Sequence, residues 1–269
     1  MNTAGDDKRD EQAAAAPLRV MISAGASGLG LGMAQAFVGQ GAHVQLCDIS
    51  QTAIDAALPQ LGERAGAMLA DVSDPAAVDA WFEHALRALG GVDVLINNAG
   101  IAGPTARIED IASEAWDQTM AVNVRSQYLC VRRAIGALRA SDRATIINMS
   151  SVAGRLGYPL RTPYAASKWA VVGLTQSLAL ELGEDNITVN AILPGIVDSE
   201  RSRVVTQAKA QARGVTVAEM EASILANVAL HRKVPVDDVA ATALFLASPA
   251  GRSFTGQSFN VCAGIQTLL

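Results

Sequence analysis

Short apolar runs alternate with longer helical patterns from residue 18 onward. Several of the runs are apolar almost throughout, which is typical of strands that a parallel sheet buries on both faces. The order strand, helix, strand, helix predicts an α/β fold: a doubly wound parallel sheet of about seven strands with helices on both faces and right-handed crossovers. The expected strands are Leu18–Ser23, His43–Asp48, Ala67–Asp71, Val92–Asn97, Thr145–Met149, Ile187–Leu193 and Ser258–Val261.

Local signals mark where some of the helices begin and end. Ser73-Asp74-Pro75 places a capping residue ahead of a proline in the first turn, and Gly90-Gly91 ends that helix. Ser113-Glu114 begins the next long one. No linker, low-complexity block or short repeat interrupts the pattern, so residues 17–269 are expected to form a single domain. Residues 1–16 are expected to be a disordered tail.

Composition narrows the class of partner. The chain has 269 residues and a formal charge of −5, from 21 basic and 26 acidic residues, with no block of Lys and Arg. Nucleic acid and anionic membranes are therefore not expected as partners. The N-terminus lacks the apolar core of a signal peptide, and no uncharged apolar run is long enough to span a membrane. We therefore expect a soluble, cytoplasmic protein.

Cysteine and histidine positions argue against a disulfide framework or a metal site. Cys47, Cys130 and Cys262 are far apart in the sequence and form no CxxC pair, which fits a reducing cytosol. The three histidines, at positions 43, 84 and 231, form no ligand cluster. No metal is predicted.

A glycine-rich turn, SAGASGLG at residues 23–30, follows the first predicted strand and precedes a predicted helix. Its spacing is not G-x-G-x-x-G, but a helix N-terminus after a glycine turn can bind pyrophosphate through backbone N–H groups. Asp48 ends the second predicted strand, 20 residues after Gly28, where a carboxylate can accept hydrogen bonds from the adenosine ribose. Together these features favour a dinucleotide site over a plain strand-to-helix turn with an ordinary strand-end aspartate.

With these motifs the sequence resembles the classical short-chain dehydrogenase/reductase (SDR) family, which has a Rossmann-type sheet, and the match covers residues 17–264. The glycine motif of the family is T-G-x-x-x-G-x-G. Ser23 stands for the threonine and Gly28 and Gly30 match, but Ala24 occupies the first glycine position. A left-handed alanine costs roughly 1–2 kcal/mol, so we expect Ala24 to keep a negative φ.

Four residues match the catalytic positions of the family. They are Asn123, Ser151, Tyr164 and Lys168, with Ser151 13 residues ahead of the Y-x-x-x-K motif. Tyrosine can serve as general acid or base, although its reference pKa is about 10. Lys168 lies one helical turn after Tyr164, so its ammonium can stabilise a phenolate and contact the nicotinamide ribose. The resemblance implies that Ser151 holds the substrate oxygen and that Asn123 supports a water-linked proton path. Spacing alone leaves Ser150 open as the oxygen holder.

The resemblance also implies a cofactor, NAD, and the residues that contact it. Asp48 would repel the 2′-phosphate of NADP, and neither Ser27 nor Ile49-Ser50 offers it a basic partner. Asn97-Asn98-Ala99-Gly100 matches the N-N-A-G motif, whose asparagines are expected to support the cofactor loop rather than simply form a turn. The expected cofactor residues are Ser23, Gly25, Ser27, Gly28, Leu29, Gly30, Asp48, Ile49, Asp71, Val72, Asn98, Ala99, Gly100, Tyr164, Lys168, Pro194, Gly195, Val197 and Ser199.

Substrate contacts are expected beneath a variable segment at about 196–232, long enough for two lid helices. Facing it should be Gly103 and the 152–163 loop, which contains Arg155, Tyr158 and Arg161. Arginines at a pocket mouth can bind a carboxylate or phosphate, so the expected substrate is a small polar secondary alcohol or ketone, which is anionic if these arginines contact it. The alternative is that these arginines are solvated or pair with nearby acids. The expected substrate residues are Gly103, Ser151, Arg155, Tyr158 and Arg201.

The predicted function is hydride transfer between NAD(H) and a secondary alcohol or ketone, with Tyr164 as general acid/base. Alternatives are a 3-oxoacyl-thioester ketoreductase that uses NADPH and a non-catalytic nucleotide-binding scaffold. A sugar-nucleotide epimerase is disfavoured, because it would have a G-x-x-G-x-x-G turn and a longer C-terminal domain. Two segments, Asn123–Arg139 and Tyr164–Leu182, resemble the interface helices of the family and imply a homotetramer.

Overall fold

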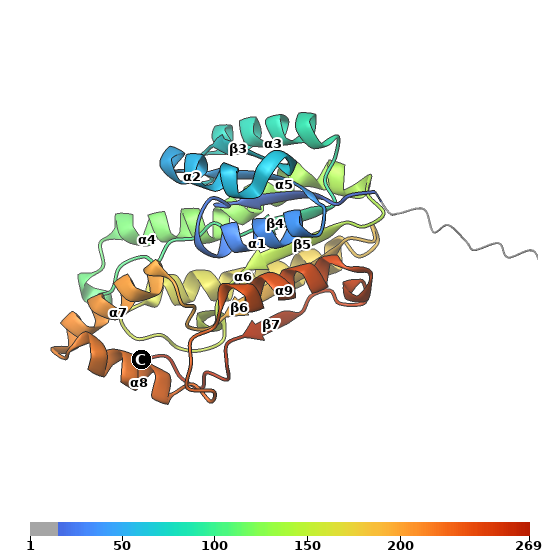
Figure 1. The fold of residues 1–269 in the computed structure, drawn as a ribbon. Coiled ribbons are helices and arrows are strands. Elements are labelled where there is room, and N and C mark those ends of the chain that lie inside the picture. The colour runs from blue at the N-terminus through green and yellow to red at the C-terminus, as the bar shows by residue number, and fades with distance from the viewer. Residues whose placement is uncertain (1–15) are drawn as a thin grey trace, which may run out of the picture.

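A computed structural model describes residues 16–269, so most of the expected N-terminal tail lies outside the described residues. Seven parallel strands form one sheet in the order β3-β2-β1-β4-β5-β6-β7, with helices on both faces (Figure 1). This is the doubly wound α/β fold that the alternating pattern predicts. The strands are β1 Arg19–Ser23, β2 His43–Asp48, β3 Ala65–Leu69, β4 Val94–Asn97, β5 Thr145–Met149, β6 Thr188–Pro194 and β7 Ser258–Val261.

Three strands, β2, β5 and β7, have the bounds expected from the sequence, and β1, β4 and β6 differ by one or two residues. The expected Ala67–Asp71 strand is displaced, because β3 begins at Ala65 and ends at Leu69. Asp71 is not in the ladder: its carboxylate accepts hydrogen bonds from the backbone N–H (2.8 Å) and hydroxyl (2.8 Å) of Ser73. The polar end of this apolar run therefore forms the turn before the next helix.

Alternate side chains of each strand pack against different helices. On β1, Val20 and Ile22 pack with α1, α2 and α9, whereas Met21 packs with α3, α5 and α6. Both faces of the sheet are therefore covered, which is why its central strands are mostly apolar. The helices are α1 Gly28–Gly39, α2 Gln51–Leu61, α3 Pro75–Leu89, α4 Ser113–Met120, α5 Ser126–Arg139, α6 Thr162–Glu181, α7 Glu200–Arg213, α8 Val217–Ala226 and α9 Val236–Ala247.

The predicted helix signals act as expected in α3. The side chain of Asp74 accepts a hydrogen bond from the N–H of Ala76 (2.9 Å), and Gly90 ends the helix in a left-handed conformation. Helices α4 and α5 are joined by a π-helical turn, Ala121–Arg125, which contains Asn123. Such turns re-aim side chains inside a helix and are frequent at functional sites.

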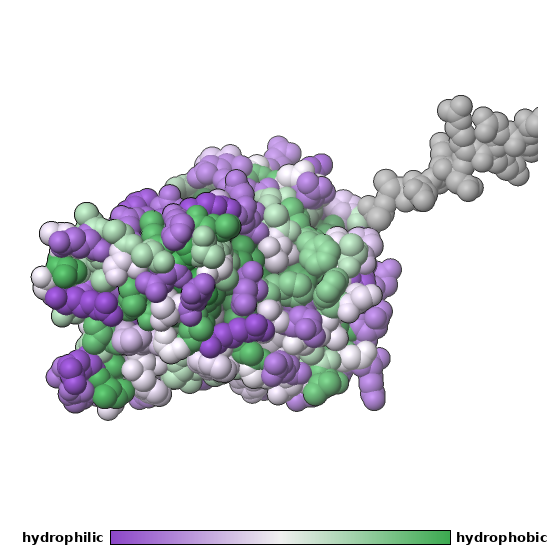
Figure 2. All heavy atoms as spheres, turned by 90° about the horizontal axis from the view of Figure 1, so that it is seen from below, coloured by the Kyte–Doolittle hydropathy of each residue, from purple (hydrophilic) through white to green (hydrophobic). Residues whose placement is uncertain are grey.

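The order of the strands reverses between β1 and β4, and ligands of open α/β sheets bind outside the carboxyl ends of the strands at such a point. Helices α7 and α8 project beyond one end of the sheet, beside the end of the chain (Figure 1). Seen from the side of β7 and α8, hydrophilic and hydrophobic side chains are intermixed on the surface (Figure 2). Among residues 16–269, no helix combines the length and the apolar character needed to cross a bilayer.

Candidate active site

The glycine turn leaves the N-terminus of α1 open. Gly28 has φ +52°, which favours glycine, although a Cβ there would meet no atom within 4 Å. Gly30 is required by space, because its Cβ would lie 2.2 Å from the carbonyl oxygen of Ala24. The side chain of Ser27, at the N-cap, makes no capping hydrogen bond to the helix. The backbone N–H groups of the first turn are therefore available to an anionic ligand.

The expectation of a negative φ at Ala24 is wrong. Its φ is +49°, in the left-handed region. Hydrogen bonds with the loop after β4 and with β2 hold this conformation: Asn98 Nδ2 donates to the carbonyl oxygens of Ser23 (3.1 Å) and Ala24 (2.9 Å), and the N–H of Gly25 donates to the carbonyl of Cys47 (3.0 Å). The methyl group is tolerated at a local cost of roughly 1–2 kcal/mol.

The hydroxyl of Ser23 ties the glycine turn to the loop after β4. Its oxygen accepts hydrogen bonds from the backbone N–H groups of Asn98 and Ala99, both at 3.0 Å. Together with the hydrogen bonds of the Asn98 amide, this contact joins the carboxyl ends of β1 and β4, between which the strand order reverses. Ser23 and Asn98 therefore act at least as supports of the turn.

Asp48 lies at the end of β2 beside the same turn and is 7% exposed. One carboxylate oxygen accepts the N–H of Ala26 (3.2 Å) and the other accepts the N–H of Ser50 (3.1 Å). Each oxygen keeps acceptor capacity for a further hydroxyl, since a carboxylate has about four lone-pair sites. Ile49 is 70% exposed next to it.

Tyr164 and Lys168 lie one turn apart on α6, as the motif predicts. The ammonium nitrogen of Lys168 is 5.7 Å from the centre of the Tyr164 ring and donates to the carbonyl of Met149 (2.9 Å). Lys168 is 4% exposed, and burial, followed by repulsion from Arg201, lowers the pKa of its ammonium to about 7. An anionic neighbour would stabilise its charged form.

The two adjacent serines have different partners. The hydroxyl of Ser150 donates to the carbonyl of Lys168 (2.8 Å) and fastens α6 to the end of β5. The oxygen of Ser151 accepts the N–H of Ala153 (3.2 Å), so its hydroxyl proton is available to a ligand. This geometry favours Ser151 over Ser150 as the group that holds a substrate oxygen.

Asn123 lies in the π-helical turn and is fully buried. Its Oδ1 accepts the N–H of Ile101 (2.7 Å), and its Nδ2 donates to the carbonyl of Ile101 (3.1 Å) and the hydroxyl of Ser167 (2.9 Å). A Cβ on Gly100 would lie 3.2 Å from Asn123 Oδ1 and 3.4 Å from Lys168 Nζ. Gly100 therefore lies between the polar ends of these two side chains.

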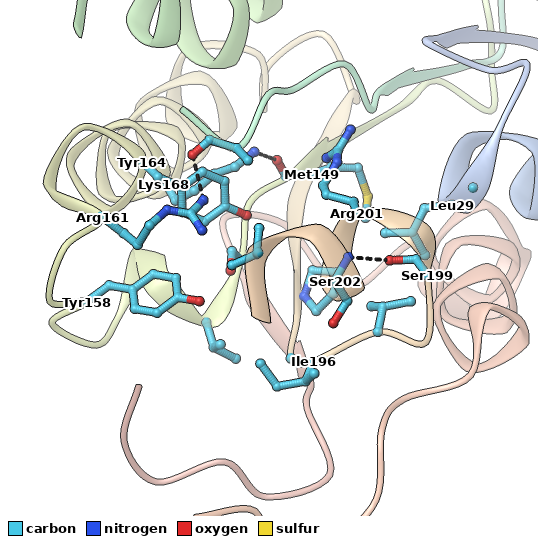
Figure 3. A pocket seen from close by; sticks show the side chains of 18 of the residues that line it. Leu29, Met149, Tyr158, Arg161, Tyr164, Lys168, Ile196, Ser199, Arg201 and Ser202 are labelled. Carbon is cyan, nitrogen blue, oxygen red and sulfur yellow. Dashed lines mark hydrogen bonds between the residues drawn. The ribbon is translucent and has the colours of Figure 1, made fainter. Parts of the chain in front are cut away.

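A cavity of about 330 Å³ lies between the carboxyl ends of the strands and α7 (Figure 3). It brings together the glycine turn, the end of β5, the start of α6 and the first turns of α7. The predicted cofactor and catalytic residues that line it are Ser27, Gly28, Leu29, Asn98, Ser151, Tyr164, Lys168, Pro194, Gly195, Val197 and Ser199. Ser23, Gly25, Gly30, Asp48, Ile49, Asp71, Val72, Ala99, Gly100 and Asn123 lie outside its lining.

Two of the five expected substrate residues are not in the cavity wall. Arg155 is exposed and donates to the carbonyl of Ser258 (3.3 Å), and Gly103 packs against Thr119. Tyr158 and Arg201 line the cavity with Ser151. The wall also contains Arg161, which the sequence places in the facing loop. Further lining residues were not singled out by the sequence analysis: Leu268 and, from the expected lid segment, Ile196, Ser202, Val205, Thr206, Lys209 and Ile224.

Nothing in the sequence distinguished Lys209 from a solvated lysine of α7, and its burial depends on the packing of Tyr158 and the end of the chain against it. Within residues 16–269, no group of three His, Cys, Asp or Glu side chains is arranged to hold a metal ion.

The fold and the cavity define a dinucleotide-binding α/β protein, and comparison with known proteins specifies its family. The family model described as enoyl-(acyl carrier protein) reductase matches residues 23–266. Galactitol 2-dehydrogenase of Agrobacterium fabrum is 37% identical over 245 residues, which cover 91% of this chain and 95% of that protein. The chain belongs to the short-chain dehydrogenase/reductase family, a family of oxidoreductases that bind nicotinamide dinucleotides.

Solved structures of the family resemble the whole domain. A variant of the actinorhodin polyketide ketoreductase, solved with NADPH, has a TM-score of 0.88 and 29% identity, with 92% of this chain and 97% of that chain covered. The 3-ketoacyl-(acyl-carrier-protein) reductase of Brucella melitensis, solved with NADH, has a TM-score of 0.80 and 33% identity, with 91% and 96% covered. Structures similar to this chain thus include complexes with either cofactor.

Proposed function

We propose that this protein is an NAD(H)-dependent oxidoreductase that interconverts a secondary alcohol and a ketone, with Tyr164 as general acid/base. The observation that carries the proposal is the convergence of Ser151, Tyr164 and Lys168 on one cavity that also borders the glycine turn. A proton-transfer group, a hydrogen-bond donor for the substrate oxygen and a cofactor site are the parts that this reaction needs.

The residues present fit a nicotinamide dinucleotide. The first turn of α1 offers unpaired backbone N–H groups for the pyrophosphate, and glycine at position 30 lets this turn pack closely against Ala24 and Asn98. Asp48 can accept the ribose hydroxyls of the adenosine half. Lys168 and Pro194-Gly195 line the cavity where the nicotinamide half would lie. When bound, the nicotinamide supplies the hydride acceptor or donor.

The side chains of this chain manage the proton. In the oxidation direction Ser151 donates a hydrogen bond to the substrate oxygen, and Tyr164, as phenolate, accepts the hydroxyl proton while the carbinol C–H bond breaks. Lys168 stabilises the phenolate through its positive charge. Asn123 holds the backbone of Ile101 and lies beside Lys168 across Gly100, where it supports a water-linked path for the proton. Reduction runs the same steps in reverse.

A second candidate is a ketoreductase acting on a 3-oxoacyl thioester with NADPH. The similarity to the actinorhodin ketoreductase favours it, whereas the similarity to galactitol 2-dehydrogenase favours a polyol or related alcohol. A non-catalytic scaffold is disfavoured because all four catalytic residues of the family are present. Assays of NAD⁺ reduction with secondary alcohols, polyols and hydroxy acids, and of NADPH oxidation with 3-oxoacyl thioesters, separate these functions. Cofactor binding without turnover in any assay would favour the scaffold.

The wild-type protein is expected to prefer NAD(H) over NADP(H), and Asp48→Asn is expected to reduce this preference. In the proposed site the carboxylate would meet a 2′-phosphate at the adenosine ribose, and residues 23–34 and 47–53 contain no Lys or Arg to pair with that phosphate. Since placing like charges together costs several kcal/mol, the ratio of kcat/KM for NAD to that for NADP should fall by about tenfold or more.

Asp55→Asn is the matched control for this measurement. It removes the same charge from an exposed position on α2, where the carboxylate accepts a hydrogen bond from the side chain of Gln51 (2.8 Å). The control should keep the wild-type ratio. Equal catalytic efficiency with both cofactors in the wild-type protein, or an unchanged ratio in Asp48→Asn, would contradict the assignment.

We further propose a homotetramer that works in the cytoplasm. Tyr128 on α5 and Trp169 and Leu180 on α6 are large apolar side chains that are 49%, 51% and 85% exposed, on the helices that resemble the interface helices of the family. The three cysteines are free, as expected in a reducing compartment. Light scattering at micromolar concentration should give the mass of four chains, and a monomer would contradict the proposal.

A further inference from the structure

Two cationic side chains are buried in the wall of the cavity, on the side of Tyr158. Arg161 immediately precedes α6, and Lys209 lies on α7; each is 2% exposed. Lysine and arginine are rarely buried to this degree unless they are paired. Neither one forms an ion pair with an acidic side chain among residues 16–269.

The guanidinium of Arg161 is only partly satisfied. Its Nη2 donates to the carbonyl of Ala102 (2.6 Å), but Nε and Nη1 have no hydrogen-bond partner within the described residues. The group lies 5.1 Å from the ring centre of Tyr164 and 5.3 Å from that of Tyr158 (Figure 3). An unsatisfied buried donor is unfavourable, and it is more so on a charged group, so this arrangement suits a group that a ligand completes.

Lys209 adds a second positive charge beside the ring of Tyr158. Its ammonium lies 3.9 Å from the ring centre of Tyr158 and donates to a main-chain oxygen of Leu269, the last residue of the printed chain, so Arg161 is the less satisfied of the two cations. Burial, followed by repulsion from Arg161, lowers the pKa of Lys209 to about 7. An anion placed between the two cations would relieve this repulsion and favour the charged form of Lys209.

The charge of the cavity wall is opposite to that of the whole chain. Four lining residues are basic, and one is acidic, Glu200, whose carboxylate is already paired with Arg203 (2.5 Å). The basic ones are Arg161, Lys168, Arg201 and Lys209. A net positive wall in a protein of charge −5 attracts anionic small molecules to this site in particular.

We propose that Arg161, supported by Lys209, binds the carboxylate or phosphate of a small hydroxy or oxo substrate. The inference rests on the proposed function, since it assumes that the alcohol oxygen lies at Tyr164. Because the guanidinium is stacked close to that ring, the anionic group must be only a few bonds from the reacting carbon. Nη2 keeps a second N–H besides the one bound to Ala102, and this N–H shares an edge of the guanidinium with Nε or with Nη1, neither of which has a partner among residues 16–269, so the group can bind either anion in bidentate fashion.

The test is Arg161→Gln assayed with matched pairs of substrates. One pair is 3-hydroxybutanoate and 3-hydroxybutanamide, and another is glycerol 3-phosphate and glycerol, in which the phosphate is three bonds from the secondary carbinol carbon. For the preferred anionic compound, KM should rise by about thirtyfold or more, because a buried charge-assisted pair is lost. Its neutral partner should change by less than about threefold, because it makes no use of the charge. The two pairs show whether the anion is a carboxylate or a phosphate.

Arg107→Gln is the matched control, because Arg107 is exposed and pairs with Glu109 outside the cavity. Arg107→Gln should leave the KM for both members of each pair at the wild-type value. Arg161→Lys keeps the charge but not the bidentate edge. Its KM for the anionic substrate should lie between the values of wild type and Arg161→Gln. An equal loss for the charged and neutral partners, or no loss for either, would overturn the inference and leave the proposed function intact.

A binding measurement keeps the inference testable without turnover. Titration calorimetry of butanoate and of inorganic phosphate into the protein saturated with NADH should detect binding of at least one anion by the wild type, and Arg161→Gln should abolish it. Thermal unfolding of the variant reports whether it is folded. If the wild-type protein turned over none of the substrates, the proposed function would be contradicted. If the wild type bound neither anion, or if the folded Arg161→Gln variant bound the anion equally well, the anion site would be refuted.

Discussion

Tyr164→Phe is expected to lower kcat by about a thousandfold or more while the affinity for NADH stays within about twofold of wild type. The substitution removes the phenol hydroxyl, which is the only part of the side chain that can take or give a proton. It keeps the ring, which packs against Arg161 and faces Lys168, so the cavity wall is preserved. Steady-state kinetics and titration of NADH fluorescence give the two quantities separately.

Tyr158→Phe is the matched control, because Tyr158 also lines the cavity and its ring lies 6.3 Å from that of Tyr164. Removing that hydroxyl should change kcat far less than removing the hydroxyl of Tyr164. If Tyr164→Phe kept more than a few per cent of activity, the role given to Tyr164 would be wrong.

Lys168→Ala is expected to impair both turnover and cofactor binding. The ammonium is buried beside the Tyr164 ring and close to Gly100, so its loss removes the charge that stabilises a phenolate and a donor for the nicotinamide ribose. We expect kcat to fall by about a hundredfold or more, and NADH affinity to fall by about tenfold, in line with the loss of a charge-assisted hydrogen bond.

Lys233→Ala provides the comparison, since Lys233 pairs with Glu221 (2.5 Å) away from the cavity. It should retain wild-type kcat and NADH affinity. Wild-type NADH affinity in Lys168→Ala would show that Lys168 does not contact the cofactor, and unchanged kcat would remove it from the mechanism.

The sheet could be predicted because burial on both faces leaves nearly unbroken apolar runs in the sequence. The bounds of β2, β5 and β7 follow from them directly. The bounds of β3 could not, because the carboxylate of Asp71 bonds to Ser73 in the turn to α3 and Asp71 does not extend the ladder. The end of the strand depends on the hydrogen bonds between Asp71 and Ser73, which a hydrophobicity pattern does not reveal.

The backbone of Ala24 shows why local rules fail at this site. An isolated alanine avoids positive φ, but two hydrogen bonds from Asn98, 74 residues away, hold the turn in that conformation. The choice between Ser150 and Ser151 likewise depends on a contact with Lys168 on another element. Such long-range contacts outweigh the local preference and are visible only once the strands are assembled.

The motif residues of the candidate site could be assigned by spacing, whereas the cationic wall could not. The four-residue interval between Tyr164 and Lys168 identifies both residues in the sequence. Arg161 and Lys209 are far apart in sequence and become one site only because Tyr158 lies between them. Arg155, which the sequence analysis names as a substrate residue, donates instead to the carbonyl of Ser258 in β7.

Transfer of deuterium from a secondary alcohol labelled at the carbinol carbon to NAD⁺ tests the central claim most directly. The wild-type protein should produce deuterated NADH from the substrate that the assay panel identifies, as measured by mass spectrometry. Tyr164→Phe, although it binds NADH, should transfer almost no label in the same time. Label transfer by Tyr164→Phe at the wild-type rate, or a wild-type protein that binds NADH but transfers no label from any alcohol of the panel, would contradict the account.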